Sequence, residues 1–360
     1  MTRLIMVVGV PGSGKSRMAK WISETNNNIK IFSSDEYRKK LLGNENDQTN
    51  NSLVFGTLYI DIAKSLVNEE SCIFDATNIC YKDRKRAFDS IDSIINKVYH
   101  VKPSYTKEAI VCCTSISNCI YFDENRERKV GQYVINKFVS RFEYPQYFEG
   151  FSSIERYVHN YGSCVEREDV FNRMAYFDQN SKYHKYSLLG HSIILSEFYF
   201  KKHDKLMMEV AKLHDIGKMM TETKGEDGYS HYYQHANYSA YTIACNPHII
   251  DFEKYPNENF ENVFREVIFF VNQHMHIRDI VKSEKAIKRY KELWGEERFN
   301  KLVEFMEYDN KASGRVAEWK THGDCGVTEC PVCKWSIEEY IDYNFCPNCG
   351  SYMKGIGEKE

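Results

Sequence analysis

The 360-residue sequence has no apolar run long enough to span a bilayer and no strong charge of either sign. Its formal net charge is −3, so a globally basic nucleic-acid-binding protein is excluded, and any contact with nucleic acid must come from a local patch. Repeats and low-complexity tracts are missing, and the first residues enter an apolar run that leaves no room for a signal peptide. We therefore expect a cytoplasmic protein with no membrane partner, whose twelve cysteines are scattered thiols and one C-terminal cluster.

The most informative segment present is Gly-Val-Pro-Gly-Ser-Gly-Lys-Ser at residues 9–16, which has the spacing of a phosphate-binding loop. It lies between an apolar, strand-like run at residues 3–8 and a helical pattern, as such a loop requires. Backbone N–H groups and a helix N-terminus favour bound phosphate there. We expect Lys15 to reach the β- and γ-phosphates of ATP or another nucleoside triphosphate, and Ser16 to bind Mg²⁺. The further residues expected at the donor nucleotide are Gly9, Gly12, Ser13 and Gly14.

The secondary-structure pattern changes along the chain and predicts three domains. Residues 1–155 alternate between strand and helix, which predicts an α/β domain with a parallel sheet and helices on both faces. Residues 165–318 lack strand signals and carry amphipathic stretches, which predicts an all-helical domain. Residues 322–356 are short, turn-rich and rich in cysteine. The expected strands are 3–9, 29–33, 71–75 and 108–113; the expected helices are 15–25, 52–68, 82–95 and 116–128, then 186–202, 205–219, 260–275 and 283–307.

Polar residues follow the phosphate-binding loop in an order that suits phosphoryl transfer. Asp35 comes after the second strand, at the sheet edge where open α/β sheets bind ligands, so it can accept a proton from an attacking hydroxyl. Arg38, one helical turn later, can hold an acceptor phosphate. Asp75 ends the third strand and can support Mg²⁺. The residues expected to face the acceptor are Thr77, Asn78 and Arg84, and those expected on a lid over the phosphates are Arg126 and Arg128. Taken singly, an aspartate after a strand is more often a helix cap, and a run of arginines more often lies on the solvent-exposed face of a helix.

Through these motifs the first 150 residues resemble the phage-type P-loop polynucleotide kinases, which phosphorylate 5′-hydroxyl ends. The resemblance rests on the loop, Ser-Asp-Glu-Tyr-Arg at 34–38, Asp-Ala-Thr-Asn at 75–78 and the 126–128 arginines. It implies that Asp35 is the general base, that Arg38 holds the acceptor and that Arg126 contacts the donor phosphates. The best-known relatives continue with an Asp-x-Asp-Gly-Thr phosphatase domain, a motif that this sequence lacks. Related kinases also phosphorylate small molecules, which leaves the acceptor open.

Nine of the twelve histidines fall between residues 184 and 276. His214 and Asp215 are adjacent, and their nitrogen and oxygen ligands suit Mn²⁺, Fe, Ni or Mg²⁺. With His191 before them and Asp309 after them, they form a series that resembles the HD-domain metal-dependent phosphohydrolases. The resemblance implies that these four residues hold a first metal ion, which would activate a water molecule for attack on phosphorus. It further implies a second set of ligands and substrate contacts at His235, His274, Lys218 and His184. For a single histidine, an ordinary surface position is the more common alternative.

Two Cys-x-x-Cys turns lie near the C-terminus, separated by twelve residues, which is the spacing of a structural zinc ribbon. The four expected Zn²⁺ ligands are Cys330, Cys333, Cys346 and Cys349. A redox pair would require a βαβ context, which this segment lacks.

The three parts together predict a bifunctional enzyme that heals nucleic-acid ends. The kinase would phosphorylate 5′-hydroxyl ends of RNA or DNA, and the HD domain would remove 3′-phosphate or 2′,3′-cyclic phosphate groups, preparing the ends for a ligase in the same pathway. Two alternatives stay open. One is a nucleotide-metabolism enzyme with small-molecule kinase and nucleotidase activities, and the other is a binding module gated by nucleoside triphosphate.

Overall fold

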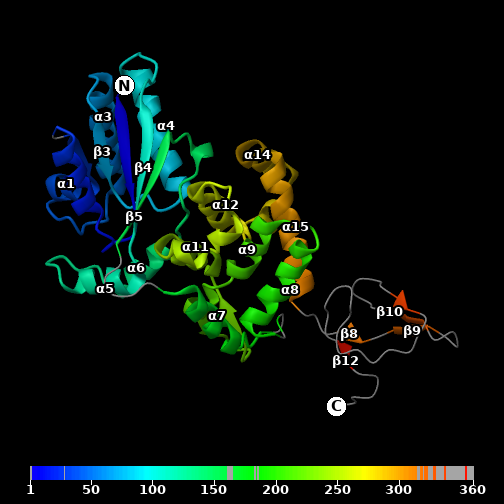
Figure 1. Cartoon of the computed structure of the whole chain (residues 1–360). Helices are drawn as coiled ribbons and strands as arrows, with labels where there is room; N and C mark the ends of the chain where they lie inside the picture. Colours follow the sequence, from blue (N-terminus) through cyan, green and yellow to red (C-terminus); the bar gives the residue numbers. More distant parts are fainter. Residues whose placement is uncertain are drawn as a thin grey trace. The chain divides into compact units, whose positions relative to one another are not determined.

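The computed structural model of the chain describes residues 2–27, 29–159, 165–181, 184 and 186–313, and the short segments 317–318, 320–322, 327–329, 336–337 and 353–354. The chain folds into two compact units, which Figure 1 shows in sequence colours. The first comprises Met1–Cys164 with Ala240–Asn246, and the second comprises Val165–Ser239 with Pro247–Glu360. No helix in the described ranges is both long and apolar enough to cross a membrane.

The first unit is built on a parallel sheet with strand order β2-β3-β1-β4-β5. Its strands are β1 (Arg3–Val8), β2 (Lys30–Ser33), β3 (Cys72–Asp75), β4 (Thr106–Cys113) and β5 (Ser153–Val158). Its helices are α1 (Lys15–Thr25), α2 (Ser34–Leu42), α3 (Asn51–Val67), α4 (Tyr81–Val98), α5 (Ile116–Glu124) and α6 (Gln132–Val139). The sequence-based positions of the first four strands are confirmed to within two residues. The edge strand β5 and the short helix α6 were not predicted, because their periodic patterns are brief.

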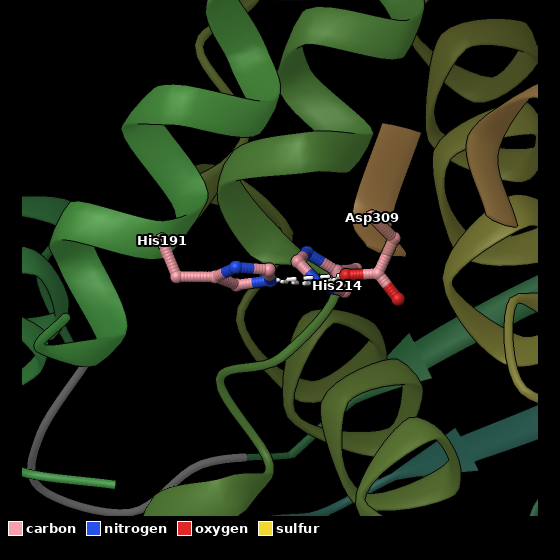
Figure 2. Close-up of side chains that lie close together, drawn as sticks. All are labelled: His191, His214 and Asp309. Atoms are coloured by element: carbon pink, nitrogen blue, oxygen red, sulfur yellow. Dashed lines mark hydrogen bonds and ion pairs between the residues drawn. The ribbon is translucent and has the colours of Figure 1, made fainter. Parts of the chain in front are cut away.

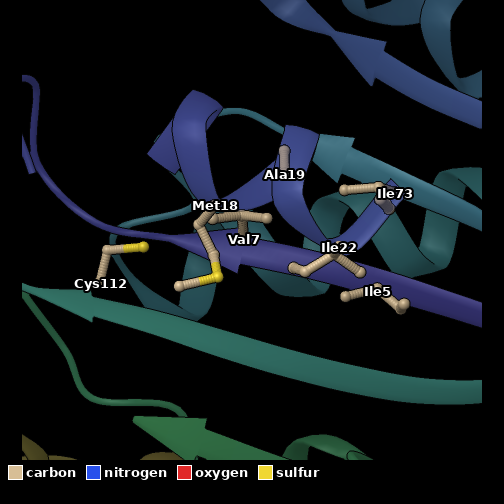
Figure 3. Close-up of a cluster of buried hydrophobic side chains, with 7 residues drawn as sticks. All are labelled: Ile5, Val7, Met18, Ala19, Ile22, Ile73 and Cys112. Atoms are coloured by element: carbon tan, nitrogen blue, oxygen red, sulfur yellow. The ribbon is translucent and has the colours of Figure 1, made fainter. Parts of the chain in front are cut away.

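Helices cover both faces of this sheet, as the sequence predicted. Successive strand residues point to opposite faces, so Ile73 faces α1 while its neighbour Phe74 faces the other side. On the α1 side, Met18 and Ile22 lie in the buried cluster shown in Figure 3, whose other members are Ile5, Val7, Ala19, Ile73 and Cys112. On the opposite side, the ring of Tyr59 from α3 packs edge-on against that of Phe74, with 5.9 Å between centroids. The packing on β1 fixes where this strand ends and the phosphate-binding loop begins.

The second unit is mainly helical. Its helices are α7 (Arg167–Tyr176), α8 (Leu188–Phe200), α9 (Lys205–Leu213), α10 (Lys218–Thr221), α12 (Phe260–Gln273), α13 (Ile277–Ile280), α14 (Glu284–Trp294) and α15 (Glu296–Ala312), and α11 (His235–Cys245) begins in it. α9 packs against α8 and α12, and α15 packs against α8. These contacts bring the ends of four helices toward one point, where the histidines lie.

The structure corrects three details of the helical prediction. A short antiparallel hairpin, β6 (Glu222–Lys224) and β7 (Ser230–Tyr232), lies in the region where no strands were expected. The stretch 283–307 is two helices, because the chain breaks at Gly295, whose φ is +87°. The helix predicted over 205–219 ends at Leu213, and the His-Asp pair lies in the turn that follows.

The C-terminal segment is described only in its short strands, β8 (Ala317–Glu318), β9 (Lys320–His322), β10 (Val327–Glu329), β11 (Ser336–Ile337) and β12 (Met353–Lys354). The four cysteines of the predicted zinc ribbon, Cys330, Cys333, Cys346 and Cys349, lie outside the described residues. Zinc binding therefore stays a prediction.

Candidate functional site

The phosphate-binding loop connects β1 to α1 and depends on glycine at defined positions. Gly12 and Gly14 have φ values of +81° and +88°, which side chains of L-residues disfavour. A Cβ atom on Gly12 would lie only 2.3 Å from the carbonyl oxygen of Cys119, so the loop can lie against α5 only without a side chain there. The hydroxyl oxygen of Ser13 is buried and has no hydrogen-bond partner in the described parts of the chain. A phosphate oxygen would satisfy this hydroxyl.

The residues after the loop carry the charges that a magnesium–triphosphate complex needs. Lys15 Nζ donates to the Val10 carbonyl at 2.8 Å, and Ser16 Oγ donates to Asp75 Oδ2 at 2.8 Å. Burial lowers the pKa of Lys15 although Asp75 opposes this shift, and burial raises the pKa of Asp75 although Lys15 opposes it. Phosphate and Mg²⁺ would supply the opposite charges beside these two buried groups. The donor set therefore fits Mg²⁺ on Ser16 and Asp75, with phosphate on Lys15.

A cavity of about 1030 Å³ opens beside the loop. Arg126 lines it together with the loop residues from Gly12 to Ser16 and aromatic side chains of α1, α5 and β5, so the structure brings Arg126 to the expected donor site. The guanidinium is held by Asp123, which accepts from Arg126 Nε at 2.9 Å and from the backbone N–H of Gly131 at 2.8 Å. Asp123, which sequence reasoning missed, fixes the lid arginine beside the cavity.

Asp35 lies at the start of α2 between two arginines. Arg38 Nη1 donates to Asp35 Oδ1 at 2.9 Å, and Arg128 Nη1 donates to Asp35 Oδ2. Arg128 also donates to Asn46 Oδ1 at 2.9 Å and to the Glu45 carbonyl at 3.2 Å. The guanidinium of Arg128, which was expected at the donor nucleotide, is thus engaged by Asp35 and the 45–46 segment, and its contact with the donor stays a prediction.

Asn78 and Arg84, which were expected to face the acceptor, have structural roles instead. Asn78 is buried and donates from Nδ2 to the Val7 carbonyl at 3.0 Å, which ties the segment after β3 to the end of β1. Arg84 is 0% exposed and donates twice to Glu149, at 2.7 and 2.8 Å, and to two backbone carbonyls. All three guanidinium nitrogens of Arg84 thus donate inside the protein, which favours a structural role over contact with the acceptor. Thr77 is half-buried, and its carbonyl accepts from Gly9 N at 3.1 Å, so its side-chain role stays a prediction.

In the second unit, the side chains of His191, His214 and Asp309 converge from α8, the end of α9 and α15 (Figure 2). His191 Nε2 lies 3.4 Å from His214 Nε2 and 3.0 Å from Asp309 Oδ1. The three side chains are buried, and their ligand atoms lie within 4.8 Å of one another. At this spacing, the three ligand atoms could bind the same cation.

Asp215 joins this group to a second one. Its Oδ2 lies 3.1 Å from His214 Nε2, whereas its Oδ1 lies 3.0 Å from His235 Nε2 and 3.6 Å from His274 Nε2. The Nε2 atoms of His235 and His274 are 3.1 Å apart. One carboxylate thus faces two pairs of imidazoles with its two oxygens, an arrangement suited to bridging two cations. The structure brings together all six side chains that the sequence predicted as ligands.

The hydrogen bonds of the four imidazoles orient them as ligands. Each Nδ1 lies near a backbone carbonyl: Ala312 for His191 (3.2 Å), Ala211 for His214 (2.8 Å), Tyr232 for His235 (2.7 Å) and Val271 for His274 (2.8 Å). A carbonyl can only accept, so each Nδ1 carries the hydrogen. With Nδ1 used in this way, each ring directs Nε2 to the centre, which is how a metal-binding histidine is usually held.

The electrostatics of the cluster match a site for cations. Burial alone would lower the pKa of His214, but Asp215 and Asp309 outweigh burial and raise it to about 9. Burial lowers the pKa of His274 to about 4, which keeps it neutral. The carboxyl pKa values of Asp215 and Asp309 are well below the usual value despite burial, because imidazoles and a lysine face them. A divalent cation would replace the proton on His214.

Two positively charged residues border the cluster without lying in it. Lys218 Nζ donates to Asp215 Oδ2 at 2.7 Å and to Gln179 Oε1 at 2.8 Å, and lies 3.2 Å from His184 Nε2. The ammonium group of Lys218 is buried and surrounded by these three partners, so the direct contact with substrate phosphate that was expected for it stays a prediction. Arg278 donates to Asp309 Oδ2 at 2.6 Å. Sequence reasoning missed Gln179 and Arg278, because no local pattern marks them.

One comparison with known families covers most of the α/β half of the chain. A family model described as an AAA domain matches residues 4–145. Curated protein sequences give no match.

Among solved structures, a fungal RNA kinase is 13% identical, with a TM-score of 0.33 over 48% of this chain and 82% of that one. A gluconokinase from Sinorhizobium meliloti is 15% identical, with a TM-score of 0.30 over 45% of this chain and 83% of that one. A deoxyadenosine kinase from M. mycoides is 19% identical, with a TM-score of 0.28 over 42% of this chain and 88% of that one. Residues 4–145 of this chain match the AAA domain model and form a parallel α/β fold with a phosphate-binding loop, and a helical region follows it.

Proposed function

We propose that the chain is a bifunctional nucleic-acid end-healing enzyme. The α/β domain would transfer phosphate from ATP to a 5′-hydroxyl end, and the histidine–aspartate cluster would serve an HD-type phosphohydrolase that removes 3′-phosphate or 2′,3′-cyclic phosphate. The observation that carries the proposal is the presence, in one chain, of a phosphate-binding loop followed by a paired aspartate and arginine, and of six converging imidazole and carboxylate side chains.

The kinase assignment is supported by the separate positions of the expected donor-phosphate residues and of Asp35 with its two arginines. Lys15, Ser16 and Arg126 line the cavity where donor phosphates fit. Asp35 follows β2 and lies between Arg38 and Arg128, so a hydroxyl beside Asp35 would have cationic side chains next to it. Two guanidinium groups suit an acceptor that carries its own phosphate, such as the phosphodiester next to a 5′-terminal hydroxyl, better than they suit a neutral sugar.

The phosphohydrolase assignment is supported by the donor set of the cluster. His191, His214 and Asp309 would hold one divalent cation, and His235 and His274 would hold a second, with Asp215 between them. Mixed imidazole and carboxylate ligands suit Mn²⁺, Fe, Ni or Mg²⁺. Bound there, such ions supply Lewis acidity toward phosphoryl oxygens and lower the pKa of water. The protein side chains hold the cluster rigid through their Nδ1–carbonyl hydrogen bonds.

The kinase is tested by incubating RNA and DNA oligomers that have 5′-hydroxyl ends with labelled ATP and Mg²⁺. We expect label transfer to an oligomer, loss of transfer in Lys15→Ala, and wild-type transfer in the matched control Lys97→Ala on the exposed side of α4. No transfer to either oligomer by the wild-type protein would refute the kinase assignment. Competition with unlabelled nucleosides and sugars decides the acceptor class, since a polynucleotide kinase should be inhibited more strongly by unlabelled oligomer.

The phosphohydrolase is tested on oligomers that end in 3′-phosphate or 2′,3′-cyclic phosphate, after loading the protein with Mn²⁺, Fe²⁺, Ni²⁺ or Mg²⁺ in turn. We expect hydrolysis with at least one metal, and its loss in the double variant His214→Ala, Asp215→Ala. The same double variant should keep the kinase activity. Hydrolysis of mononucleotides but of no oligomer would instead support a nucleotidase.

A further inference from the structure

Lys218 fixes the hydrogen-bonding state of His184. An ammonium group has three donors and no acceptor. Asp215 Oδ2, Gln179 Oε1 and His184 Nε2 lie 2.7, 2.8 and 3.2 Å from Lys218 Nζ, so these three groups account for all three donors. His184 Nε2 must therefore accept from Lys218, and in a neutral imidazole the hydrogen then lies on Nδ1.

The Nδ1 atom of His184 lacks an acceptor in the described part of the chain. It is buried, and the described residues offer it no hydrogen-bond partner. A buried N–H group without an acceptor destabilises the folded protein, so a ligand that accepts from it is favoured. The ring packs edge-on against the ring of His191, with 4.8 Å between centroids, so this unused donor belongs to a side chain in contact with the first metal-ligand group.

The other imidazoles of the region differ from His184 in this respect. In His191, His214, His235 and His274, Nδ1 is satisfied by a carbonyl and Nε2 faces the cluster. In His184 the arrangement is reversed, because Nε2 is used by Lys218 and none of the described residues accepts from Nδ1–H. His184 is thus built as a hydrogen-bond donor, whereas the four others are built as ligands.

We propose that His184 Nδ1–H donates a hydrogen bond to a phosphoryl oxygen of the substrate at the metal cluster, and that Lys218 is the positioning residue that fixes this tautomer. The ligand class is an anionic phosphate ester, and the contact rests on the phosphohydrolase function proposed above. Such a donor stabilises negative charge that develops on phosphoryl oxygens during hydrolysis. Lys218 acts through His184 and Asp215 and does not contact the substrate.

The tautomer is measured directly by ¹⁵N NMR of the full chain labelled at histidine, with His184 assigned by comparison with His184→Asn. We expect a neutral ring protonated on Nδ1, whose Nδ1–H signal moves when inorganic phosphate is added to the Mg²⁺-loaded protein. In Lys218→Met we expect this tautomer preference to be lost. A proton on Nε2 in the wild-type protein, or an Nδ1–H signal that phosphate leaves unchanged, would overturn the proposal.

Kinetics give a second, independent measurement. His184→Ala should lower kcat for hydrolysis of the 2′,3′-cyclic phosphate oligomer about 100-fold, the usual effect of removing one such donor, with unchanged metal content and unchanged kinase activity. His184→Asn, whose amide Nδ2–H replaces the Nδ1–H, should recover at least tenfold of that loss. The matched control is His203→Asn, at an exposed position with φ +57° that asparagine tolerates.

The outcomes separate this inference from the proposed function. Wild-type kcat in His184→Ala, or metal loss in that variant, would contradict a donor role. If the wild-type protein hydrolyses no phosphate ester with any metal, the proposed function fails, and the NMR response to inorganic phosphate still decides whether His184 is a phosphate donor.

Discussion

Replacement of Arg84 by methionine should destabilise the first unit while leaving its chemistry intact. The guanidinium is fully buried and makes two hydrogen bonds to Glu149, at 2.7 and 2.8 Å, and one each to the carbonyls of Asn78 and Glu143, at 3.0 and 2.9 Å. Removing one member of a buried ion pair leaves the other charge unpaired and typically costs about 3–5 kcal/mol. Methionine fills a similar volume, so most of this cost would come from the carboxylate of Glu149 and the two abandoned carbonyls.

The free energy of local unfolding is best followed by hydrogen exchange in peptides from β1, β3 and α4, because the chain has two units and a single global transition is not expected. Arg84→Met should lower the protection of these peptides by about 3–5 kcal/mol. The matched control, Arg86→Met on the exposed side of the same helix, should change protection by less than about 0.5 kcal/mol. The double variant Arg84→Met, Glu149→Leu should recover part of the loss, since it removes the unpaired charge.

Phosphoryl transfer per folded molecule should stay within about twofold of wild type in Arg84→Met at a temperature where the variant is folded. An unchanged protection pattern combined with a large increase in KM for the oligomer would refute this reasoning. That result would return Arg84 to the acceptor site that sequence patterns alone suggested.

Three further predictions follow from the two sites. Gly12→Ala should weaken ATP binding in calorimetry at least tenfold, because its Cβ would meet the Cys119 carbonyl at 2.3 Å. The control Gly43→Ala has a similar φ of +78° and no atom within 4 Å, so its ATP affinity should be unchanged. Equal ATP affinities in both variants would contradict the close approach. The affinity of the cluster for a divalent cation should rise about tenfold per pH unit from pH 7 toward the His214 pKa of about 9 and level off above it. The reason is that binding releases the proton that His214 holds below that pKa. An affinity independent of pH would contradict this exchange. Arg278→Gln should weaken metal binding about 10- to 100-fold, because Asp309 Oδ2 loses the donor that orients it. Arg289→Gln on the exposed face of α14 is the control. Equal metal content of both variants at limiting metal would exclude an orienting role for Arg278.

What the sequence predicted well depends on short-range patterns. The loop from Gly9 to Ser16 is recognisable because spacing, glycine and the flanking strand and helix all lie within about twenty residues. The six expected ligands came from the resemblance to the HD-domain family, which the adjacent His214 and Asp215 made recognisable, and the structure brings their side chains together. In both cases a short motif made the site recognisable.

What the sequence did not predict depends on partners distant along the chain. Arg84 is held by Glu149, 65 residues away, and Arg128 by Asp35, 93 residues away. Lys218 is held partly by Gln179, 39 residues away, and no periodicity announces that contact. An arginine or lysine near a motif thus looks like a ligand in the sequence, whereas the fold decides whether its donors are already engaged. The burial of the side chain and its hydrogen-bond partners in the structure show whether its donors are engaged.

The central claim, that one chain carries two independent phosphoryl chemistries, is tested most directly with a single oligomer that has a 5′-hydroxyl and a 2′,3′-cyclic phosphate end. Mass spectrometry after incubation with ATP, Mg²⁺ and the activating metal reports both ends at once. We predict phosphate gain at the 5′ end and hydrolysis at the 3′ end in the wild-type protein, loss of only the first in Lys15→Ala, and loss of only the second in Asp309→Asn. An oligomer unchanged at both ends, or one substitution that abolishes both reactions in a folded protein, would contradict the account.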